Sequence, residues 1–295
     1  MNQTLFVWLL LCLIWGSTWI FIKIGLRDLP PITYAGARFT LAATILWGLI
    51  FAQRRRLPRG FSDWWLMAWT GWLAFSINYA LIFWGEQYIT SGLAAVLQAM
   101  IPAFGMLFAH FHLPNEKLTL RKVFGVVLGT AGTGLIFFDQ MKIEGTMALW
   151  GCAAMLVSAL TVGYYNVVIK ARAGHLDPGV LAAGQMSFGL FPLVSFGLAF
   201  EGNPFELQWT TTAVGSTLYL AVVGSAVAFL LYYWLVRKID VTITLLISLV
   251  TPVIALLIGM FTLSEKVTWR VAVGSAAIIS GIGLIVFQRI AKSRK

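Results

Sequence analysis

One charged side chain, Arg38, lies well inside a long apolar segment of this sequence, and its chemistry is that of anion recognition. It stands within the apolar run Thr33–Phe51, and no Asp or Glu lies at a comparable depth in any apolar run. A guanidinium group is planar and permanently charged, so it can bind a carboxylate or phosphate through two parallel hydrogen bonds. The alternatives are a structural bond to backbone carbonyls and an extended side chain that reaches the nearer end of the segment.

A second group of candidate binding residues is polar or aromatic and also lies within apolar runs. Amides and hydroxyls there can bind the polar part of a solute, whereas Trp and Tyr can cover its apolar part. The same polar side chains can instead hydrogen-bond neighbouring helices to each other, and the sequence leaves both interpretations open. Besides Arg38, the substrate-binding candidates are Trp15, Trp19, Asn78, Tyr79, Gln98, Tyr164, Tyr165, Asn166, Gln185, Trp234 and Ser248.

Two prolines, Pro102 and Pro252, stand near the middle of apolar runs and are 150 residues apart. Proline has no N–H and clashes with the carbonyl four residues before it, so a kink is expected at each position. The kinks should free the carbonyls of Gln98 and Ser248. We interpret the prolines as gating kinks that shape a binding cavity. A structural kink whose carbonyl is satisfied by a neighbouring helix is the alternative.

The residue types needed for enzymatic or metal chemistry do not occur at suitable spacings. His110 and His112 are two residues apart and therefore lie on different faces of a helix. Cys12 and Cys152 each lie in an apolar run without a CxxC spacing. HExxH motifs, paired interior carboxylates and nucleophile–base arrangements are absent from the sequence. We therefore predict no catalytic residue, no metal site and no cofactor.

Composition indicates that lipid is the solvent for much of the chain. Of its 295 residues, 59% are hydrophobic and only 11% are charged, whereas soluble domains carry about 25% charged residues. An apolar segment of about 20 residues is long enough to cross a bilayer. Ten such segments are predicted: Leu5–Ile24, Thr33–Phe51, Trp64–Phe83, Ser91–Phe111, Val123–Phe138, Thr146–Ile169, Val180–Phe200, Ala213–Leu235, Thr242–Leu263 and Trp269–Phe287.

The basic residues predict the orientation of these spans. If the N-terminus is cytoplasmic, 15 of the 21 Lys and Arg residues lie on the cytoplasmic side and 5 on the other. Cytoplasmic loops normally carry this excess, so both termini are expected in the cytoplasm. The first apolar run lacks a preceding Lys or Arg and a cleavage site, and we interpret it as a retained span. The net charge of +10 is explained by these loops, so no nucleic-acid partner is expected.

The two halves of the chain repeat each other. Glu116-Lys117-Leu118-Thr119 recurs as Glu265-Lys266-Val267-Thr268, and three glycines follow each copy in the same register. Because the repeat holds five predicted helices, an odd number, the second copy must enter the membrane from the opposite face. Inverted repeats of this kind recur in secondary transporters. We assign residues 1–144 and 145–295 to the two repeats. We expect the small-residue spacings, such as Gly125-xxx-Gly129, to pack within one protomer rather than to form a homodimer.

The sequence resembles the drug/metabolite transporter superfamily, in its EamA-type branch. The resemblance covers essentially the whole chain, and it rests on the order of several weak motifs rather than on one. The motifs are Ile14-Trp15-Gly16-Ser17-Thr18-Trp19, Arg38-Phe39, Tyr88-Ile89-Thr90-Ser91-Gly92-Leu93-Ala94-Ala95, Pro102 and the two Glu-Lys-x-Thr loops. The resemblance implies an all-α bundle of five plus five membrane helices around a central cavity. It also implies export or uptake of amino acids or related metabolites.

The charged residues inside the apolar runs favour one class of substrate. A site with Arg and amides suits zwitterionic or anionic compounds, whereas exchange of a proton for an organic cation typically uses a buried carboxylate. We therefore expect a transporter of amino acids or related metabolites, working by alternating access in the bacterial inner membrane. Its expected partners are the substrate and the lipid bilayer. The alternatives are a multidrug or organic-cation exporter and an integral-membrane enzyme; the repeat disfavours a channel or receptor.

Overall fold

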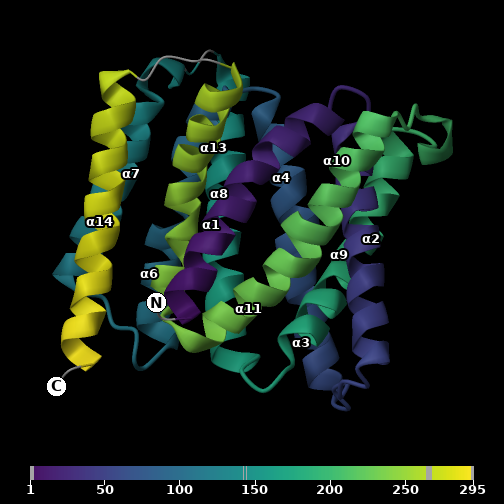
Figure 1. Cartoon of the computed structure of the whole chain (residues 1–295), viewed down its shortest axis with the longest axis horizontal. Helices are drawn as coiled ribbons and strands as arrows, with labels where there is room; N and C mark the ends of the chain where they lie inside the picture. Colours follow the sequence, from purple (N-terminus) through teal and green to yellow (C-terminus); the bar gives the residue numbers. More distant parts are fainter. Residues whose placement is uncertain (1–2, 142, 144, 264–267, 294–295) are drawn as a thin grey trace. The chain divides into compact units, whose positions relative to one another are not determined.

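The computed structural model describes residues 3–141, 143, 145–263 and 268–293, and every regular element in these ranges is helical. Figure 1 shows the course of the chain. Two of the elements, η1 and η4, are π-helices, and η2 and η3 are 3-10 turns. In chain order the elements are α1 (Gln3–Gly25), α2 (Pro31–Ala52), α3 (Phe61–Gly71), η1 (Trp72–Ile77), α4 (Asn78–Glu86), α5 (Ser91–Gln98), α6 (Ile101–His112), α7 (Leu120–Ile136), η2 (Phe138–Gln140), α8 (Thr146–Arg172), α9 (Pro178–Phe200), η3 (Pro204–Glu206), α10 (Thr211–Ala221), η4 (Val222–Val227), α11 (Ala228–Lys238), α12 (Val241–Leu245), α13 (Ile247–Leu263) and α14 (Trp269–Ser293).

The prediction of an all-helical membrane protein is confirmed, and nine of the ten predicted spans recur. Among the described residues, nine helices are long and apolar enough to cross a bilayer. The exception is the predicted span Val123–Phe138, which corresponds to the 17-residue helix α7. At 1.5 Å per residue, α7 is only about 25 Å long, against about 30 Å for a bilayer core. The arrangement of ten spans as an inverted repeat therefore stays a prediction.

The chain divides into two compact units, and each unit takes segments from both halves of the sequence. Unit 1 comprises residues 1–83 and 172–238, and unit 2 comprises residues 84–171 and 239–295. Unit 1 therefore contains α1, α2, α3, η1, α9, α10, η4 and α11, whereas unit 2 contains α5 to α8 and α12 to α14. A division by spatial contacts does not test where one sequence repeat ends and the next begins. The predicted boundary between the repeats at residue 144 therefore stays a prediction.

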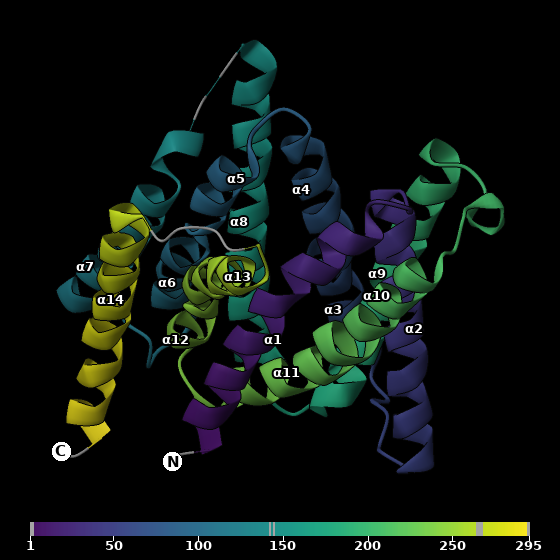
Figure 2. The same ribbon diagram turned by 45° about the horizontal axis from the view of Figure 1, so that its top comes forward.

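In unit 1, α9 packs against α2, α3 and η1, and α1 packs against α10 and α11; the two views in Figures 1 and 2 show α1 alongside α10 and α11. Glycine permits the closest of these approaches, because a Cβ atom added at Gly71 would lie 2.9 Å from the Cα atom of Gln185.

Helix α2 begins with Pro31, a favoured first residue. Its free N–H groups at Ile32 and Thr33 donate to the carboxylate of Glu201 at 2.9 and 2.6 Å, which fixes the end of α9 to the start of α2.

In unit 2, α7 and α14 lie side by side in both ribbon views. A Cβ atom added at Gly132 or at Gly274 would lie 2.6 Å from the carbonyl oxygen of the other residue, and Gly125 and Gly281 face each other in the same manner. The two backbones are thus in close contact between Gly125 and Gly132 of α7. The prediction that these glycines pack within one chain is confirmed.

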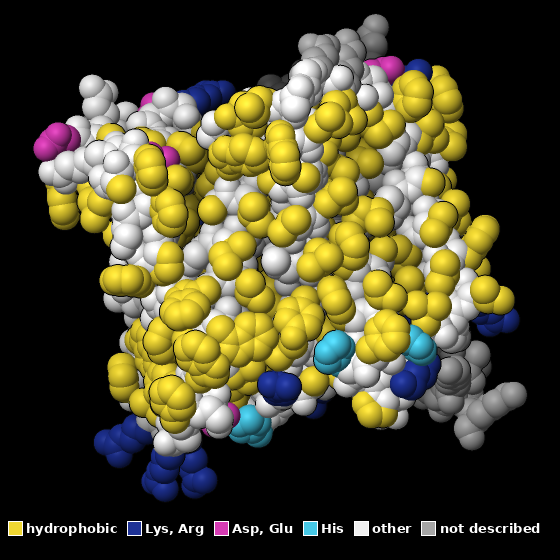
Figure 3. Space-filling view, turned by 180° about the vertical axis from the view of Figure 1, so that it is seen from behind, with side chains coloured by type: hydrophobic (Ala, Val, Ile, Leu, Met, Phe, Trp, Pro, Cys, Tyr) yellow, Lys and Arg dark blue, Asp and Glu magenta, His cyan; other side chains and the backbone are white. Residues whose placement is uncertain are grey.

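The surface matches a lipid environment. Many large hydrophobic side chains are exposed, including Phe191 at 78%, Phe124 at 62% and Ile279 at 69%. Figure 3 shows one face on which hydrophobic side chains predominate and on which Lys and Arg gather towards the edges. Because a water-facing surface rarely carries large apolar patches, lipid is the solvent that this distribution fits.

Candidate functional site

Arg38 is buried in unit 1, where α2 faces the π-helix η4. Only 6% of the residue is exposed. Its Nε donates a hydrogen bond to the Ser225 hydroxyl at 2.7 Å, and its Nη2 donates to the Gly224 carbonyl at 3.1 Å. Arg38 therefore does make the structural bond to a backbone carbonyl that was one of the alternatives to substrate binding.

The π-helix geometry explains how this carbonyl becomes an acceptor for side chains. A π-helix widens the turn, and such segments occur frequently at functional sites. The Gly224 carbonyl also accepts a hydrogen bond from the indole Nε1 of Trp15 at 3.3 Å. A Cβ atom at position 224 would lie 2.8 Å from Thr18 Cγ2 and 3.4 Å from Arg38 Nη2. Glycine at this position therefore allows Trp15 and Arg38 to meet at one point.

Part of the Arg38 guanidinium remains open to a further acceptor. The group has five N–H donors, and its hydrogen bonds within the described part of the chain use Nε and Nη2. None of the ion pairs among the described residues involves Arg38. A buried cation without a partner of opposite charge is unfavourable. A carboxylate or phosphate group bound at Nη1 would supply that charge.

A continuous series of aromatic rings adjoins Arg38. The guanidinium carbon lies 5.0 Å from the centre of the Phe39 ring. Ring centres are then 4.9 to 5.7 Å apart from one neighbour to the next along the series Tyr79, Phe39, Phe75, Phe229, Trp15 and Tyr232. Edge-on and tilted contacts at such distances are favourable. The structure therefore brings three predicted residues, Trp15, Arg38 and Tyr79, into one cluster of charge and aromatic surface.

Gln185 on α9 lies next to the start of the other π-helix, η1. Gln185 is fully buried, and its Nε2 donates to the Thr70 hydroxyl at 2.7 Å, whereas its Oε1 has no hydrogen-bond partner among the described residues. The π-helices Trp72–Ile77 and Val222–Val227 are 150 residues apart, the offset that also separates Pro102 from Pro252. This structural match agrees with the repeat seen in the sequence.

The contacts of the other candidate binding residues in unit 1 do not indicate a role in substrate binding. The amide of Asn78, at the start of α4, donates to the carbonyl of Ala74 in η1 at 3.5 Å. Trp234 is half-buried. Trp19 lies in α1, but its side chain falls outside the described residues. A binding role for these three residues stays a prediction.

The candidates in unit 2 make contacts of several kinds. Gln98 Nε2 donates to the Ser158 hydroxyl at 2.9 Å, which joins α5 to α8. Asn166 donates to the Val162 carbonyl, one turn earlier in α8, whereas Ser248 at the start of α13 donates to the Leu245 carbonyl at the end of α12. Tyr164 packs its ring against Phe108 and His112, whereas Tyr165 is buried.

The two prolines differ in their effect on the helix, because the chain breaks its helix beside Pro102 but not at Pro252. Helix α5 ends at Gln98 and α6 begins at Ile101, so Pro102 lies in the first turn of a new helix. The Ala99 carbonyl accepts from the Thr130 hydroxyl at 3.2 Å. Pro252 lies inside α13, and the Ser248 carbonyl accepts from the Thr251 hydroxyl at 3.3 Å. The expectation of a free carbonyl at Ser248 is therefore wrong, because a nearby hydroxyl replaces the missing N–H. A gating role for the prolines stays a prediction.

Several known proteins similar to this chain are described as transporters. The sequence model of the EamA-like transporter family matches residues 3–138 and 149–287. The uncharacterized transporter YoaV of Bacillus subtilis is 31% identical over 279 residues, which cover 93% of this chain and 94% of YoaV. The uncharacterized inner membrane transporter YedA of Escherichia coli K12 is 26% identical over 286 residues, or 94% of this chain and 86% of YedA. One crystal structure aligns over 98% of both chains with a TM-score of 0.83 at 18% identity, which shows the fold alone.

Proposed function

The chain belongs to the EamA-like transporter family, and on that premise we propose that it is a carrier of small metabolites bearing a carboxylate, with amino acids first. The observation that carries this proposal is the Arg38 guanidinium, which is buried and retains N–H donors without a described acceptor. A substrate carboxylate there would gain charge-assisted hydrogen bonds. The adjoining aromatic rings would cover the apolar part of the same molecule.

The electrostatics of the site favour this class over organic cations. A cation bound near Arg38 would meet a like charge, and only aromatic faces would hold it, at about 0.5–2 kcal/mol. A zwitterion can place its carboxylate on Arg38 and its ammonium group on carbonyls or rings. We therefore propose neutral zwitterionic or anionic substrates moved by alternating access, and we treat cation export as the competing result of the experiment.

The experiment is counterflow in proteoliposomes made with the purified full-length protein. Vesicles preloaded with a mixture of amino acids should accumulate an external labelled amino acid, with an initial rate that saturates. Empty vesicles provide the baseline. Proton-driven movement of a permanent cation, with no accumulation of any zwitterion or anion, would contradict the proposed substrate class. Chemical conversion of the solute without net flux would indicate an enzyme instead.

The same proposal includes an orientation with both termini in the cytoplasm, and this orientation predicts a labelling pattern. In a background without Cys12 and Cys152, a cysteine at Ile143 should react with an impermeant reagent from outside intact cells. A cysteine at Arg56 should react only after the membrane is opened. Both native side chains are exposed, so access to the reagent depends on the side of the membrane. The reverse pattern would show that the excess of Arg and Lys does not set the orientation.

A further inference from the structure

The loop between α2 and α3, residues 53–60, carries a run of arginines that directly follows a membrane helix. The four are Arg54, Arg55, Arg56 and Arg59. Helix α2, which is long and apolar enough to cross a bilayer, ends at Ala52. The next acidic residue along the chain, Asp63, is bound to His175 at 2.9 Å. The arginines therefore lie close to a bilayer surface, whichever side of the membrane they face.

One of these arginines fixes the loop to the rest of unit 1. Arg55 Nη1 donates to both carboxylate oxygens of Asp177, at 2.8 and 3.0 Å. The same carboxylate caps α9 by accepting from two N–H groups in its first turn. Further along the loop, the Pro58 carbonyl accepts from the indole N–H of Trp64 at 3.1 Å. The backbone that carries the other arginines is thus anchored at two points.

The other three arginines have no anionic partner in the part of the chain that the structure describes. Arg54, Arg56 and Arg59 are exposed, and none of them takes part in a described ion pair or side-chain hydrogen bond. We refer to these three residues as the arginine patch. Like charges so close along the chain repel each other, so a bound anion would relieve this repulsion.

The backbone at Arg54 is strained in a way that the fold does not require. The N–H groups of Arg54 and Arg55 donate to the carbonyls of Phe51 and Ile50, at 3.1 and 3.0 Å, which is the Schellman ending of a helix. Arg54 stands at the left-handed position of this motif, with φ of 49°. Glycine is the usual residue there because a side chain disfavours the conformation. Strained residues of this kind are concentrated at functional positions.

Exposed apolar side chains flank the arginine patch on both sides in the sequence. They are Phe51, Leu57, Phe61 and Trp65. Figure 3 shows Lys and Arg side chains that project beyond a hydrophobic surface at its lower edge. A small soluble anion would gain nothing from apolar neighbours. A phospholipid, in contrast, carries its phosphate next to its acyl chains, so it matches both parts of this surface.

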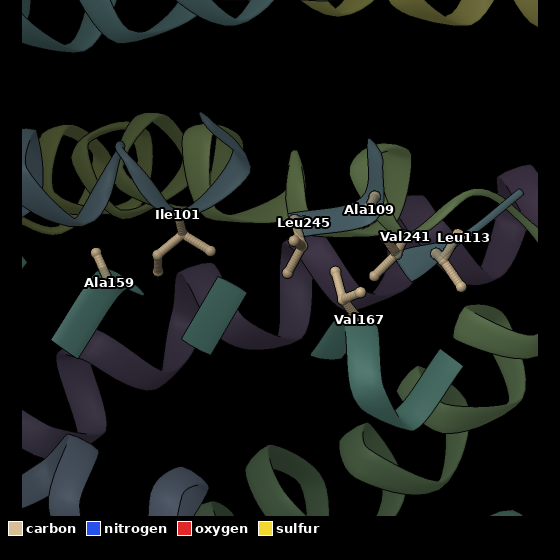
Figure 4. Close-up of a cluster of buried hydrophobic side chains, with 7 residues drawn as sticks. All are labelled: Ile101, Ala109, Leu113, Ala159, Val167, Val241 and Leu245. Atoms are coloured by element: carbon tan, nitrogen blue, oxygen red, sulfur yellow. The ribbon is translucent and has the colours of Figure 1, made fainter. Parts of the chain in front are cut away.

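A second basic loop, between α6 and α7, differs because its lysines bind within the protein. Lys117 Nζ donates to a carbonyl of α6 at 3.2 Å, and Lys122 Nζ lies 3.9 Å from the carboxylate of Asp240. Leu113, directly after α6, belongs to a buried apolar cluster, and Figure 4 shows these side chains converging. These interactions give that loop a role in the packing of unit 2. The arginine patch has no such internal role among the described residues.

We propose that the arginine patch binds the phosphate of an anionic phospholipid, of the phosphatidylglycerol class, in the leaflet that the loop faces. Guanidinium groups suit this ligand because each can donate two parallel hydrogen bonds to phosphate oxygens. Basic clusters beside a membrane helix are attracted to anionic leaflets. A zwitterionic lipid has the same phosphate, but its own cationic group opposes the arginines. The inference depends neither on the transported solute nor on the orientation of the termini.

Native mass spectrometry of the full-length protein in detergent measures this binding directly. The protein is titrated with phosphatidylglycerol and, separately, with phosphatidylcholine of the same acyl chains. The unsubstituted protein should bind phosphatidylglycerol more tightly. Changing Arg54, Arg56 or Arg59 to Gln should each weaken phosphatidylglycerol binding about fivefold and change phosphatidylcholine binding little. The triple variant should lose the preference between the two lipids.

Arg121→Gln is the matched control, because Arg121 is an exposed arginine of unit 2 and its loss changes the net charge equally. It should leave phosphatidylglycerol binding unchanged. Inorganic phosphate should not displace phosphatidylglycerol, because it cannot use the apolar side chains beside the patch. Displacement by inorganic phosphate would indicate a site for free anions and would contradict the lipid assignment.

Arg54→Gly separates the charge of Arg54 from its backbone conformation. This variant should lose phosphatidylglycerol affinity by the same factor as Arg54→Gln, but the apparent Tm of the delipidated protein should rise, because glycine adopts the left-handed conformation without strain. A lower Tm would show that the arginine serves the fold. Equal affinity of the unsubstituted protein for both lipids, or a triple variant that keeps the preference, would overturn the proposal. Such a result would leave the counterflow experiment on substrate class unaffected.

Discussion

Replacing Arg38 with Gln should weaken transport of a carboxylate substrate far more than transport of its uncharged amide analogue. Hydrogen bonds to a charged group contribute about 1.5–3 kcal/mol, so we expect KM for the acid to rise about 10- to 100-fold. Arg38 also holds the π-helix η4 through Ser225 and Gly224. Loss of these two hydrogen bonds should impair transport of the acid and of the amide by the same factor. The ratio of the two KM changes, measured in proteoliposomes, isolates the contribution of the substrate contact.

Ser225→Ala is the matched control for this measurement. It removes the acceptor for Arg38 Nε but leaves the charge, so it should change acid and amide transport by the same factor. Arg38→Lys should restore acid transport only in part, because an ammonium group lacks the planar pair of donors. Equal losses for acid and amide in Arg38→Gln would show that Arg38 is structural and would remove the main support for the proposed substrate class.

Replacing Gly281 with Leu should strongly destabilise unit 2. The backbones of α7 and α14 touch at Gly125 and Gly281, and a Cβ atom at position 281 would also lie 3.1 Å from the backbone nitrogen of Gly129. Overpacking usually costs about 1–3 kcal/mol, and backbone atoms cannot rotate away as side chains can. We expect the upper end of that range, which corresponds to a decrease of roughly 6–12 °C in apparent Tm.

Gly283 provides the comparison, because it lies two residues further along α14 and an added Cβ atom there meets nothing within 4 Å. Gly283→Leu should therefore unfold close to the temperature of the unsubstituted protein. Thermal unfolding of both variants in one detergent makes the measurement. Equal Tm values for the two variants would mean that contact between α7 and α14 does not limit stability.

The helices were predictable from the sequence because apolar runs are long and the breaks between them carry charges or turn residues. The short fifth run also appears as the short helix α7. The interruptions within spans were less predictable. Pro102 indicated a break, and the helix does end near it. The change from α12 to α13 at Leu246 precedes Pro252 by six residues, and no proline or glycine lies there to signal it.

The candidate site was partly predictable for a similar reason. Arg38 stands out because a charge in an apolar run needs an explanation, and Trp15, another of the candidates, donates to the same Gly224 carbonyl as Arg38. Ser225 and Phe229 were missed, because neither residue type is unusual in a membrane helix. Their importance comes from the π-helix, which places the Gly224 carbonyl and the Ser225 hydroxyl against Arg38. Sequence patterns based on helical periodicity do not reveal where a helix widens to a π-turn. The two π-helices are separated by the same 150 residues as the sequence repeat. This match becomes visible only in the three-dimensional structure.

The pairing of α7 with α14 has a consequence for biosynthesis. Helix α7 ends at Ile136, and its partner begins at Trp269, so the ribosome makes α14 about 130 residues later. At about 5–20 residues per second, α7 waits roughly 7–27 s for the surface that covers its glycines. Unit 1 has a similar delay, since α1 and α2 precede α9 to α11 in the chain. Neither unit can mature while the nascent chain is half made, and a translational stall before α14 would leave the bare backbone of α7 open to partners in other proteins.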